Sequence, residues 1–454
     1  MKDISKQIYR KIIPASIRKI IWEQKNKILT KRDERIFKKK IKGSLYMNKA
    51  IIFYGAGQYA KSNLERWLSE GLIPTCFVDK DERKHHKYIK TSYGSYGNEI
   101  QFEILPLKEA IERYPEYQII ITIALEPYSA YQELLESGIP QERLHYTGPK
   151  WCPEIGNYFV IHGPGIQTCC SKQALCLPSK GNINDDLALY QQYCSQLSNS
   201  LRAGLFTSCT GCYMLHDGIS EINMKIKEVN VSSGLPGGDH CNFKCSYCTY
   251  GEDINKYTYK DNVLEILLHI SNIVQLEKIH YNCGEITVSP FRDEILSLWE
   301  KNIWKGEVLT NGSIYNEKIA DLLQKNLITL QCSIDSGTKG TFARIKGADC
   351  FDKVINNLKK YSETNGSIYL KYIILEGIND NNADLDGFVA ISKEINAKVV
   401  ISRDNRISSA MTKSEYSAVL RLTEQCKLAG IPYSFVLDYV DKDLDRLRSD
   451  NLIQ

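Results

Sequence analysis

The chain has 454 residues, of which 43% are apolar and 25% charged, a composition typical of a globular protein with two or three domains. No apolar run reaches the roughly 18 residues of a membrane span, and the first residues lack the features of an export signal, so we expect a cytoplasmic protein. The net charge of +4 is uneven, because residues 1–49 carry sixteen Lys or Arg against four Asp or Glu. Basic charge confined to one end argues against a nucleic-acid partner.

Residues 1–49 form the first segment, in which isoleucines recur at helical spacing among basic residues and Pro14 interrupts the run. We therefore predict a basic helical N-terminal arm. Such an arm could lie on anionic lipid as a peripheral membrane contact, or it could pack on its own domain or on a partner subunit. The stretch "IYRKIIPASIRKII" also resembles the start of bacterial capsule and surface-glycan biosynthesis proteins.

Residues 50–150 change to alternating strands and helices, beginning with "KAIIFYGAGQYAKSNLERW". Gly55 and Gly57 follow an apolar strand and precede a helix, and Asp79 ends the next strand, which predicts a Rossmann-like nucleotide-binding domain. In this interpretation Gly55 allows the tight turn, Gly57 admits a phosphate, and Asp79 accepts from a ribose hydroxyl. The domain resembles the small nucleotide-binding domains attached to sugar acyltransferases. The alternative is that the glycines only allow close packing of a helix.

Residues 151–225 are rich in cysteine. The chain has fifteen cysteines, and an odd number without an export signal indicates metal binding more than a disulfide framework. Cys169 and Cys170 form a close pair, and "CTGC" supplies Cys209 and Cys212. Several thiolates suit either zinc or an iron-sulfur cluster. We expect these four cysteines to bind a second, auxiliary iron-sulfur cluster, with a structural zinc site as the alternative.

Residues 226–454 alternate between strand-like and helix-like stretches, with six predicted strands from "EVNVSSG" to "AKVVISR". This pattern predicts an α/β fold, a partial (β/α)6 TIM-like barrel with its functional residues at the carboxyl ends of the strands. The loop after the first strand contains "CNFKCSYC", with Cys241, Cys245 and Cys248. A structural zinc site would need a fourth ligand, for which His240 is nearest, whereas a [4Fe–4S] cluster held by three cysteines keeps one iron open.

The C-x3-C-x2-C spacing, with an aromatic residue before the last cysteine, resembles the signature of the radical S-adenosylmethionine (SAM) enzymes. "NCGE" resembles the G-G-E motif of this family, and "CSIDSGTKGTFARIKG" resembles its fourth-strand segment. The resemblance implies a [4Fe–4S] cluster whose open iron binds SAM, a 5'-deoxyadenosyl radical that abstracts a substrate hydrogen, and a flavodoxin- or ferredoxin-type electron donor. The cofactor contacts that it implies are Tyr247, Gly284, Glu285, Thr310, Asn311, Ser333, Asp335 and Arg344.

Four features bear on the substrate: the Rossmann-like domain, the cysteine-rich segment, the basic arm and the resemblance to glycan proteins. Together they favour a nucleotide-linked sugar or polyol, modified for a cell-surface glycan. A substrate radical could be oxidised, which is dehydrogenation, or receive a hydrogen atom from a thiol, which is epimerisation. The candidate donors are Cys332, Cys350 and Cys283. The cysteine-rich segment resembles SPASM-like regions, so a peptide-modifying maturase is the alternative enzyme. The non-enzymatic alternative is a zinc-binding scaffold.

Overall fold

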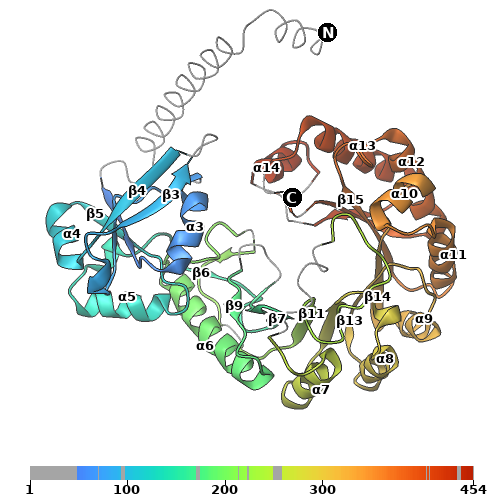
Figure 1. The fold of residues 1–454 in the computed structure, drawn as a ribbon, viewed down its shortest axis with the longest axis horizontal. Coiled ribbons are helices and arrows are strands. Elements are labelled where there is room, and N and C mark those ends of the chain that lie inside the picture. Colours follow the sequence, from blue (N-terminus) through green and yellow to red (C-terminus); the bar gives the residue numbers. More distant parts are fainter. Residues whose placement is uncertain are drawn as a thin grey trace, which may run out of the picture. The chain divides into compact units, whose positions relative to one another are not determined.

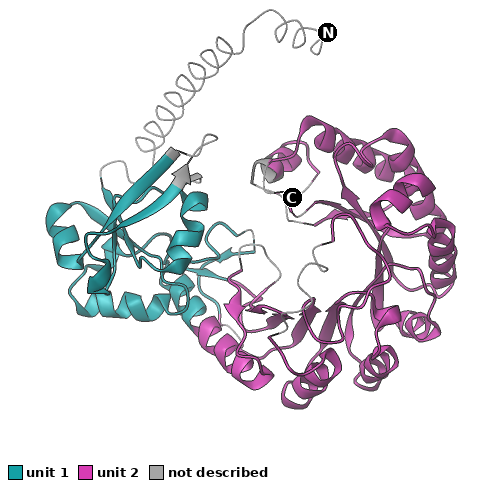
Figure 2. Cartoon of the chain, in the orientation of Figure 1, with its two compact units in different colours: residues 1–151, 196–220 teal, residues 152–195, 221–454 magenta. Residues whose placement is uncertain are grey.

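A computed structural model of the chain describes residues 49–69, 71–93, 98–169, 174–212, 214–221, 224–248, 258–404, 406–407, 410–436 and 441–452. The predicted basic arm, apart from its last residue, and Cys170 lie outside these residues. The chain divides into two compact units, which Figure 2 shows in teal and magenta. Unit 1 comprises residues 1–151 and 196–220, and unit 2 comprises residues 152–195 and 221–454. The predicted cysteine-rich segment is therefore divided between the two units.

Unit 1 is built on a five-stranded sheet with the strand order β3-β4-β2-β1-β5 (Figure 1). Its strands are parallel except for β3, which pairs antiparallel with β4. The strands of the unit are β1 (Ala50–Tyr54), β2 (Cys76–Val78), β3 (Tyr88–Tyr93), β4 (Asn98–Leu105), β5 (Tyr117–Ile121) and the small pair β6 (Lys150–Trp151) and β10 (His216–Asp217). The helices are α3 (Gln58–Ser69), α4 (Leu107–Arg113) and α5 (Pro127–Glu136), with 3-10 turns η1 (Glu82–Lys84) and η2 (Gln141–Arg143).

Strand β1 shows why this sheet is buried on both faces. Its sequence AIIFY is a continuous apolar run, which is typical of a parallel strand covered by helices on both sides. Successive side chains point to opposite faces. Phe53 packs against Trp67 of α3 with ring centroids 5.5 Å apart, whereas Ile52 lies in the other core with Leu134 of α5. The sheet therefore separates two hydrophobic cores.

Unit 2 is built on a ten-stranded sheet with the order β17-β16-β15-β14-β13-β12-β11-β7-β8-β9. Neighbouring strands from β17 to β7 are parallel, and β8 and β9 continue the sheet in the antiparallel direction. The strands are β7 (Tyr158–His162), β8 (Gly165–Gln167), β9 (Leu177–Pro178), β11 (Glu228–Ser232), β12 (Lys278–Asn282), β13 (Lys305–Thr310), β14 (Ile328–Ser333), β15 (Ile368–Ile374), β16 (Lys398–Arg403) and β17 (Tyr433–Phe435). All six predicted strands are present as β11 to β16, which confirms the α/β fold class.

Helices cover the convex side of this curved sheet (Figure 1). The helices of unit 2 are α6 (Ile183–Arg202), which continues into unit 1, α7 (Val263–Ile273), α8 (Arg292–Lys301), α9 (Glu317–Gln324), α10 (Lys339–Lys346), α11 (Phe351–Ser362), α12 (Asn382–Ile395), α13 (Lys413–Ala429) and α14 (Asp441–Ser449), with the 3-10 turn η3 (Ile286–Val288) after β12. Among the described residues, none of the helices has both the length and the apolar character that crossing a membrane requires.

The strands of unit 2 direct alternate side chains toward the helices and toward the concave side of the sheet. On β7, Phe159 packs against Tyr190 of α6 with ring centroids 5.0 Å apart, so this face lies toward the helices. On the opposite face, the Tyr158 hydroxyl accepts from Asn230 Nδ2 at 2.9 Å, and the Tyr158 ring centroid lies 5.9 Å from that of His280. We call the face that carries Tyr158, Asn230 and His280 the lumenal face.

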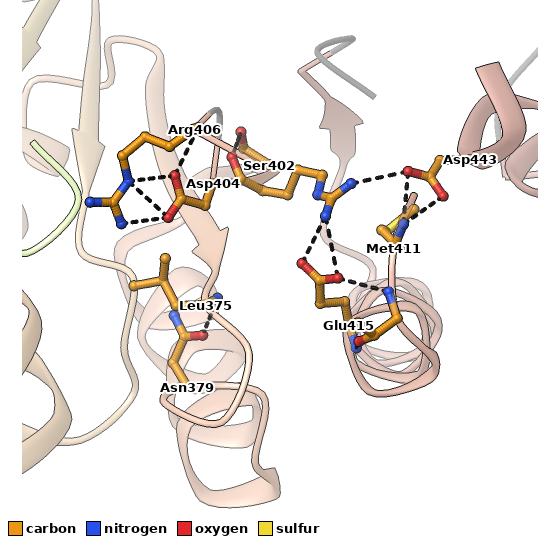
Figure 3. Close-up of polar contacts among 10 residues, drawn as sticks. Leu375, Asn379, Ser402, Asp404, Arg406, Met411, Glu415 and Asp443 are labelled. Carbon is orange, nitrogen blue, oxygen red and sulfur yellow. Dashed lines mark hydrogen bonds and ion pairs between the residues drawn. The ribbon is translucent and has the colours of Figure 1, made fainter. Parts of the chain in front are cut away.

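Arg403, at the end of β16, anchors the C-terminal helices. Its side chain is 2% exposed and donates to Glu415 of α13 at 3.1 Å and to Asp443 of α14 at 3.2 Å. Asp443 also accepts from the backbone N–H of Met411 at 2.9 Å, and Figure 3 shows Glu415, Met411 and Asp443 with these contacts as dashed lines. Since buried charges persist only when they are paired and hydrogen-bonded, this network fixes α13 and α14 against the last long parallel strand.

The alanine substitution of Gly306 on β13 is expected to lower the free energy of unfolding by at least about 2 kcal/mol, because it overpacks a buried strand. A Cβ at Gly306 would lie 1.7 Å from the carbonyl oxygen of Ile279 and 2.9 Å from the Trp299 side chain. Gly340→Ala is the matched control, because a Cβ at this helical position meets no atom within 4 Å. Chemical denaturation of the two variants measures the difference, and equal midpoints would contradict the expectation.

Candidate functional site

The loop that follows β11 carries Cys241, Cys245 and Cys248 at the carboxyl end of the parallel strands. Cys241 and Cys248 are exposed, and Cys245 is partly buried. Burial raises the pKa of the Cys245 thiol to about 11, and the charges of the other two thiols add to this rise. Within the described residues, no three Cys, His, Asp or Glu side chains converge closely enough to hold a metal ion. The loop supplies three soft ligands with enough exposure to turn toward an iron-sulfur cluster.

Backbone hydrogen bonds to α10 fix the position of this cysteine loop. The N–H of Lys244 donates to the carbonyl of Lys346 at 3.1 Å, and the N–H of Ser246 donates to the carbonyl of Ile345 at 2.8 Å. Gly347 ends α10 in the left-handed conformation, with φ 63°. A Cβ at Gly347 would lie 2.8 Å from the Lys244 carbonyl oxygen, so glycine allows the loop and the helix end to approach.

Three polar side chains meet beneath the cysteine loop: those of the predicted residues Tyr247 and Asp335, and that of Lys346. The Tyr247 hydroxyl donates to Asp335 Oδ2 at 2.6 Å, the Lys346 ammonium donates to the Tyr247 hydroxyl at 2.6 Å, and Lys346 forms an ion pair with Asp335. Asp335 is fully buried and Lys346 is 2% exposed. Burial, together with the Asp335 charge, raises the pKa of Tyr247 well above its usual value. Sequence reasoning missed Lys346, which no pattern distinguished from Arg344 two residues earlier.

Glu285 ties the end of β12 to the end of β13. Its carboxylate is buried and accepts from the Thr287 hydroxyl at 2.6 Å, from the Thr310 hydroxyl at 2.9 Å and from the Asn311 N–H at 2.5 Å. Burial raises the pKa of this carboxyl, and the donors partly offset the rise. The structure thus brings the predicted residues Glu285, Thr310 and Asn311 together. Their predicted contact with SAM stays a prediction.

The side chain of Asn311 connects this network to the cysteine loop. Its Nδ2 donates to Asn242 Oδ1 at 2.8 Å and lies 3.9 Å from Cys241 Sγ, and Asn242 donates in turn to the Ser313 hydroxyl at 2.9 Å. Sequence reasoning did not select Asn242 or Ser313. Gly284, the remaining predicted residue here, has φ 36°, and a Cβ on it would lie 2.5 Å and 2.7 Å from backbone carbonyl oxygens of the cysteine loop, those of His240 and Gly238. Its lack of a side chain lets the two loops meet.

Ser333 and Arg344 occupy different surroundings. Ser333 ends β14 on the lumenal face, in register with Lys371 of β15. Arg344 is exposed and donates to the backbone carbonyl of Ile378 at 2.8 Å. Its predicted contact with the SAM carboxylate stays a prediction.

Arg406, which sequence reasoning did not select, approaches the cysteine loop from beyond β16. Its guanidinium donates to the carbonyl oxygen of Ser246 at 3.0 Å. Asp404 holds the guanidinium with a hydrogen bond of 2.9 Å from Nε, and this pair is visible in Figure 3. A cation therefore lies within reach of the residues between the second and third cysteines.

Of the three predicted hydrogen donors, Cys332 and Cys283 are buried, whereas Cys350 is partly buried at the N-cap of α11. Cys332 has the parity of the helix-facing side chains of β14, and a Cβ at Gly312 would lie 3.4 Å from its Sγ and 3.1 Å from Val354 of α11. The Cys283 thiol donates to the carbonyl of Ser232 at 2.9 Å. Burial raises the pKa of both thiols. Cys332 therefore points away from the lumenal face, and the role of all the predicted thiols as hydrogen donors stays a prediction.

The four cysteines predicted to bind an auxiliary cluster are divided between the units. Cys169 belongs to unit 2, Cys209 and Cys212 belong to unit 1, and Cys170 lies outside the described residues. In the "CTGC" stretch the N–H of Cys212 donates to the carbonyl of Cys209 at 2.9 Å, which forms a tight turn. Cys169 also adds its charge to the environment of the buried Cys194, whose pKa burial raises to about 12. The predicted ligand set stays a prediction.

In unit 1, Gly55 and Asp79 lie at the carboxyl ends of β1 and β2. Gly55 has φ 117°, a conformation that favours glycine, and a Cβ on it would lie 2.9 Å from Ile123. Asp79 Oδ2 accepts from the Ala56 N–H and from the Lys84 ammonium, both at 2.8 Å. Burial would raise the pKa of Asp79, but these donors outweigh it and lower the pKa. Asp79 therefore holds the glycine loop in place. At Gly57, by contrast, a Cβ would meet no atom within 4 Å.

Charged groups gather at the amino ends of the lumenal strands. His280 Nε2 lies 2.5 Å from Glu228 Oε1, and His280 Nδ1 lies 4.0 Å from Glu307 Oε2. Burial lowers the pKa of His280, but hydrogen bonds and charges from Glu228 and Glu307 outweigh it and raise the pKa to about 9. Glu154 and Lys278 also lie near this group. The imidazole is therefore a cation at neutral pH.

Replacing His280 by Gln is expected to remove a pH-dependent part of the stability. Because the folded pKa of about 9 exceeds the unfolded value of 6.5, the contribution is complete below pH 6.5 and is lost as the pH rises through 9. The difference in free energy of unfolding between the natural chain and His280→Gln should therefore shrink between these two pH values. Denaturation at a series of pH values measures it, and a difference that grows with pH would contradict the assignment.

Comparison with known proteins adds to this geometry. Residues 235–389 match the family model of the Radical SAM superfamily. Among curated relatives, the chain is 28% identical over 152 residues to GTP 3',8-cyclase of Clostridium perfringens (strain SM101 / Type A), covering 31% of this chain and 46% of the relative. It is 23% identical over 212 residues to GTP 3',8-cyclase of Synechocystis sp., covering 46% and 63%. The chain spans about half the length of the curated relatives that it matches.

Among solved structures, Streptococcus suis SuiB bound to precursor peptide SuiA is 11% identical with a TM-score of 0.40, covering 64% of this chain and 73% of SuiB. The structure of anSMEcpe with bound AdoMet is 19% identical with a TM-score of 0.36, covering 46% and 63%. The family model covers the cysteine loop and the strand ends around it. Residues 235–389 therefore match the Radical SAM superfamily, a family whose cofactors are a [4Fe–4S] cluster and SAM.

Proposed function

We propose that the chain is a radical SAM enzyme that abstracts a hydrogen atom from a nucleotide-linked sugar or polyol in cell-surface glycan biosynthesis. The observation that carries the proposal is the cysteine loop with three thiols at the carboxyl ends of the parallel strands, beside a polar lumenal face. When bound, the reduced cluster and SAM supply a 5'-deoxyadenosyl radical. A flavodoxin- or ferredoxin-type protein would supply the electron.

The residues of the chain have distinct parts in this proposal. Cys241, Cys245 and Cys248 would hold the cluster, because the donor set of three exposed or partly buried thiols fits an open iron. The contacts of the loop with α10 fix where the three thiols lie. The polar network of Glu285 and Asn311 would place SAM contacts next to Cys241. This arrangement would orient the reacting groups and exclude side reactions.

The lumenal face supports a substrate that carries hydroxyl groups. Asn282 Nδ2 donates to Asn230 Oδ1 at 3.1 Å, and Asn230 donates to Tyr158, so amides and a phenol line the wall beside the cysteine loop. Such groups form hydrogen bonds with hydroxyls. The curated relatives are named for GTP, a nucleotide, which agrees with a nucleotide-linked substrate. The glycine loop at Gly55 and Gly57 also supports a nucleotide-linked substrate. A further part of the proposal is an auxiliary iron-sulfur cluster, bound by Cys169, Cys170, Cys209 and Cys212.

Anaerobic incubation with candidate nucleotide sugars in deuterium oxide tests this function. The reconstituted chain, SAM and dithionite should form 5'-deoxyadenosine only when the right substrate is present. The product should carry solvent deuterium at one carbon after epimerisation, or lose two mass units after dehydrogenation. Cys350→Ser, which changes a thiol outside the proposed site, is the control. Formation of 5'-deoxyadenosine that responds only to a peptide would overturn the proposed substrate class.

A further inference from the structure

We propose that Cys176, paired with His162, donates the hydrogen atom that converts the substrate radical into product. The inference deepens the proposed function, on which it rests, and it selects epimerisation over dehydrogenation. It depends on three observations: the face of β7 that carries His162, the contact between the two side chains, and the glycines that bring them beside the cysteine loop.

His162 lies on the lumenal wall of unit 2. Strand β7 pairs parallel with β11, so Tyr158 is opposite Glu228 and Val160 is opposite Asn230. His162 has the same parity as Tyr158, whose hydroxyl contacts Asn230 on the lumenal face. Because it is the last residue of β7, His162 stands at the carboxyl end of the parallel strands, where the cysteine loop also begins.

The thiol of Cys176 lies against this histidine. Cys176 Sγ is 3.6 Å from His162 Nε2, and Cys176 is exposed. Neighbouring protein atoms partly desolvate both groups, which lowers the pKa of His162 and raises that of Cys176, so both groups stay neutral near pH 7 and the thiol keeps its hydrogen. A neutral thiol next to a neutral imidazole is suited to hydrogen-atom donation. Cys332 and Cys283, by contrast, are fully buried.

Glycines remove the side chains that would separate this pair from the cysteine loop. A Cβ at Gly165 would lie 3.1 Å from Cys176 Sγ, so glycine there makes room for the thiol. A Cβ at Gly163 would lie 2.4 Å from the carbonyl oxygen of Gly234, the second residue after β11. The N–H of Gly163 also donates to the carbonyl of Ser233 at 2.8 Å. The turn after His162 therefore packs directly on the start of the cysteine loop.

A neighbouring amide indicates a ligand in the same part of the lumen. Asn282 is opposite Ser232, the last residue of β11, and β11 lies between β12 and β7. The Asn282 Oδ1 atom is shielded from solvent and has no hydrogen-bond partner among the described residues. A buried acceptor without a partner is costly, and a substrate hydroxyl could supply the missing donor. The substrate carbon would then lie between the cysteine loop and the wall that carries His162.

The chemical step balances as follows. The substrate carbon radical takes the hydrogen atom of the Cys176 S–H bond, which forms a C–H bond on the product and leaves a Cys176 thiyl radical. One electron from a one-electron reductant, an iron-sulfur or flavin protein or dithionite in vitro, and one proton restore the thiol. Delivery from the face opposite to the abstraction inverts the carbon. His162 is a positioning residue, which orients the S–H bond by accepting from it.

Two variants test the inference in deuterium oxide, with Cys350→Ser as the thiol control. Thiol hydrogens exchange with solvent, so the natural chain should place one deuterium on the product carbon. Cys176→Ser should still form 5'-deoxyadenosine and keep the iron and sulfide of the natural chain, while deuterium incorporation falls at least about 100-fold. His162→Gln should lower the ratio of deuterated product to 5'-deoxyadenosine without abolishing it. Mass-spectrometric mapping of alkylated thiols in the chain without a cluster should find Cys176 labelled, and labelled faster in His162→Gln.

The other outcomes separate the two proposals. Loss of iron in Cys176→Ser would make Cys176 a metal ligand and overturn the inference. Undiminished deuterium incorporation in that variant would do the same. A natural chain whose product lacks two mass units and carries no deuterium would overturn the inference and leave the proposed function standing. A natural chain that forms no 5'-deoxyadenosine with any nucleotide sugar would remove both.

Discussion

Replacing Lys346 by Met is expected to lower the free energy of unfolding by about 3–5 kcal/mol, the effect of leaving one member of a buried ion pair without its partner. Lys346 is 2% exposed, and Asp335 is fully buried. Without the ammonium, the Asp335 carboxylate would keep only neutral donors, among them the Tyr247 hydroxyl at 2.6 Å and the Ile373 N–H at 2.7 Å. Chemical denaturation of the chain without a cluster measures the change.

Two control variants make this result specific. Lys339→Met removes an exposed lysine that pairs with Asp352, with side chains 66% and 65% exposed, and should change stability by less than about 0.5 kcal/mol. The double variant Asp335→Asn with Lys346→Met removes both buried charges, so it should be more stable than Lys346→Met alone. A Lys346→Met chain as stable as the natural one would show that the ammonium is not a buried partner of Asp335.

Replacing Cys245 by Ala is expected to remove about four iron atoms per chain, because a [4Fe–4S] cluster on three cysteines cannot lose one of them and remain bound. Cleavage of SAM should fall below detection for the same reason. Cys245 is the least exposed of the three cysteines, and the loop around it is anchored to α10 by the Ser246 N–H. Iron and sulfide analysis after anaerobic reconstitution measures the loss, with Cys350→Ser as control. Full iron content in Cys245→Ala would contradict the assignment.

The repeating part of the fold was predictable from the sequence. Apolar and polar residues alternate in strands such as β11 (EVNVS), β12 (KIHYN) and β14 (ITLQCS), so local patterning identifies them. Strand β7 was not predicted as part of this sheet, although YFVIH is apolar, because it lies in the cysteine-rich segment and pairs with β11 across a separation of about 70 residues. Such a long-range pairing leaves no local signal.

The residues of the candidate site were likewise predictable only in part. The cysteine loop and Glu285 belong to contiguous motifs, and the structure places Glu285 with Thr310 and Asn311. Lys346 and Arg406 could not be selected, because their importance comes from contacts that form only after folding. Lys346 pairs with Asp335 of the preceding strand end, and Arg406 donates to the Ser246 carbonyl, which is 160 residues away in the sequence. A sequence pattern identifies side chains that act from one segment, whereas pairs that meet only after folding require coordinates.

The predicted nucleotide site in unit 1 shows another limit of motif reading. The sequence suggested that Asp79 would bind a ribose hydroxyl. In the structure its carboxylate already accepts from Ala56, Lys84 and the Asp81 N–H, the last at 2.9 Å. A glycine-rich loop followed by an acidic residue is therefore compatible with a ligand site, and also with a turn that the acidic side chain stabilises by hydrogen bonds. Binding of nucleotide sugars to the full chain remains the test of that proposal.

The most direct test of the central claim is the electron paramagnetic resonance spectrum of the anaerobically reduced chain, recorded with and without SAM. We predict an iron-sulfur signal that changes when SAM is added, because one iron of a cluster on Cys241, Cys245 and Cys248 has no protein ligand. A signal that SAM leaves unchanged, or a chain that contains zinc and no iron, would contradict the account.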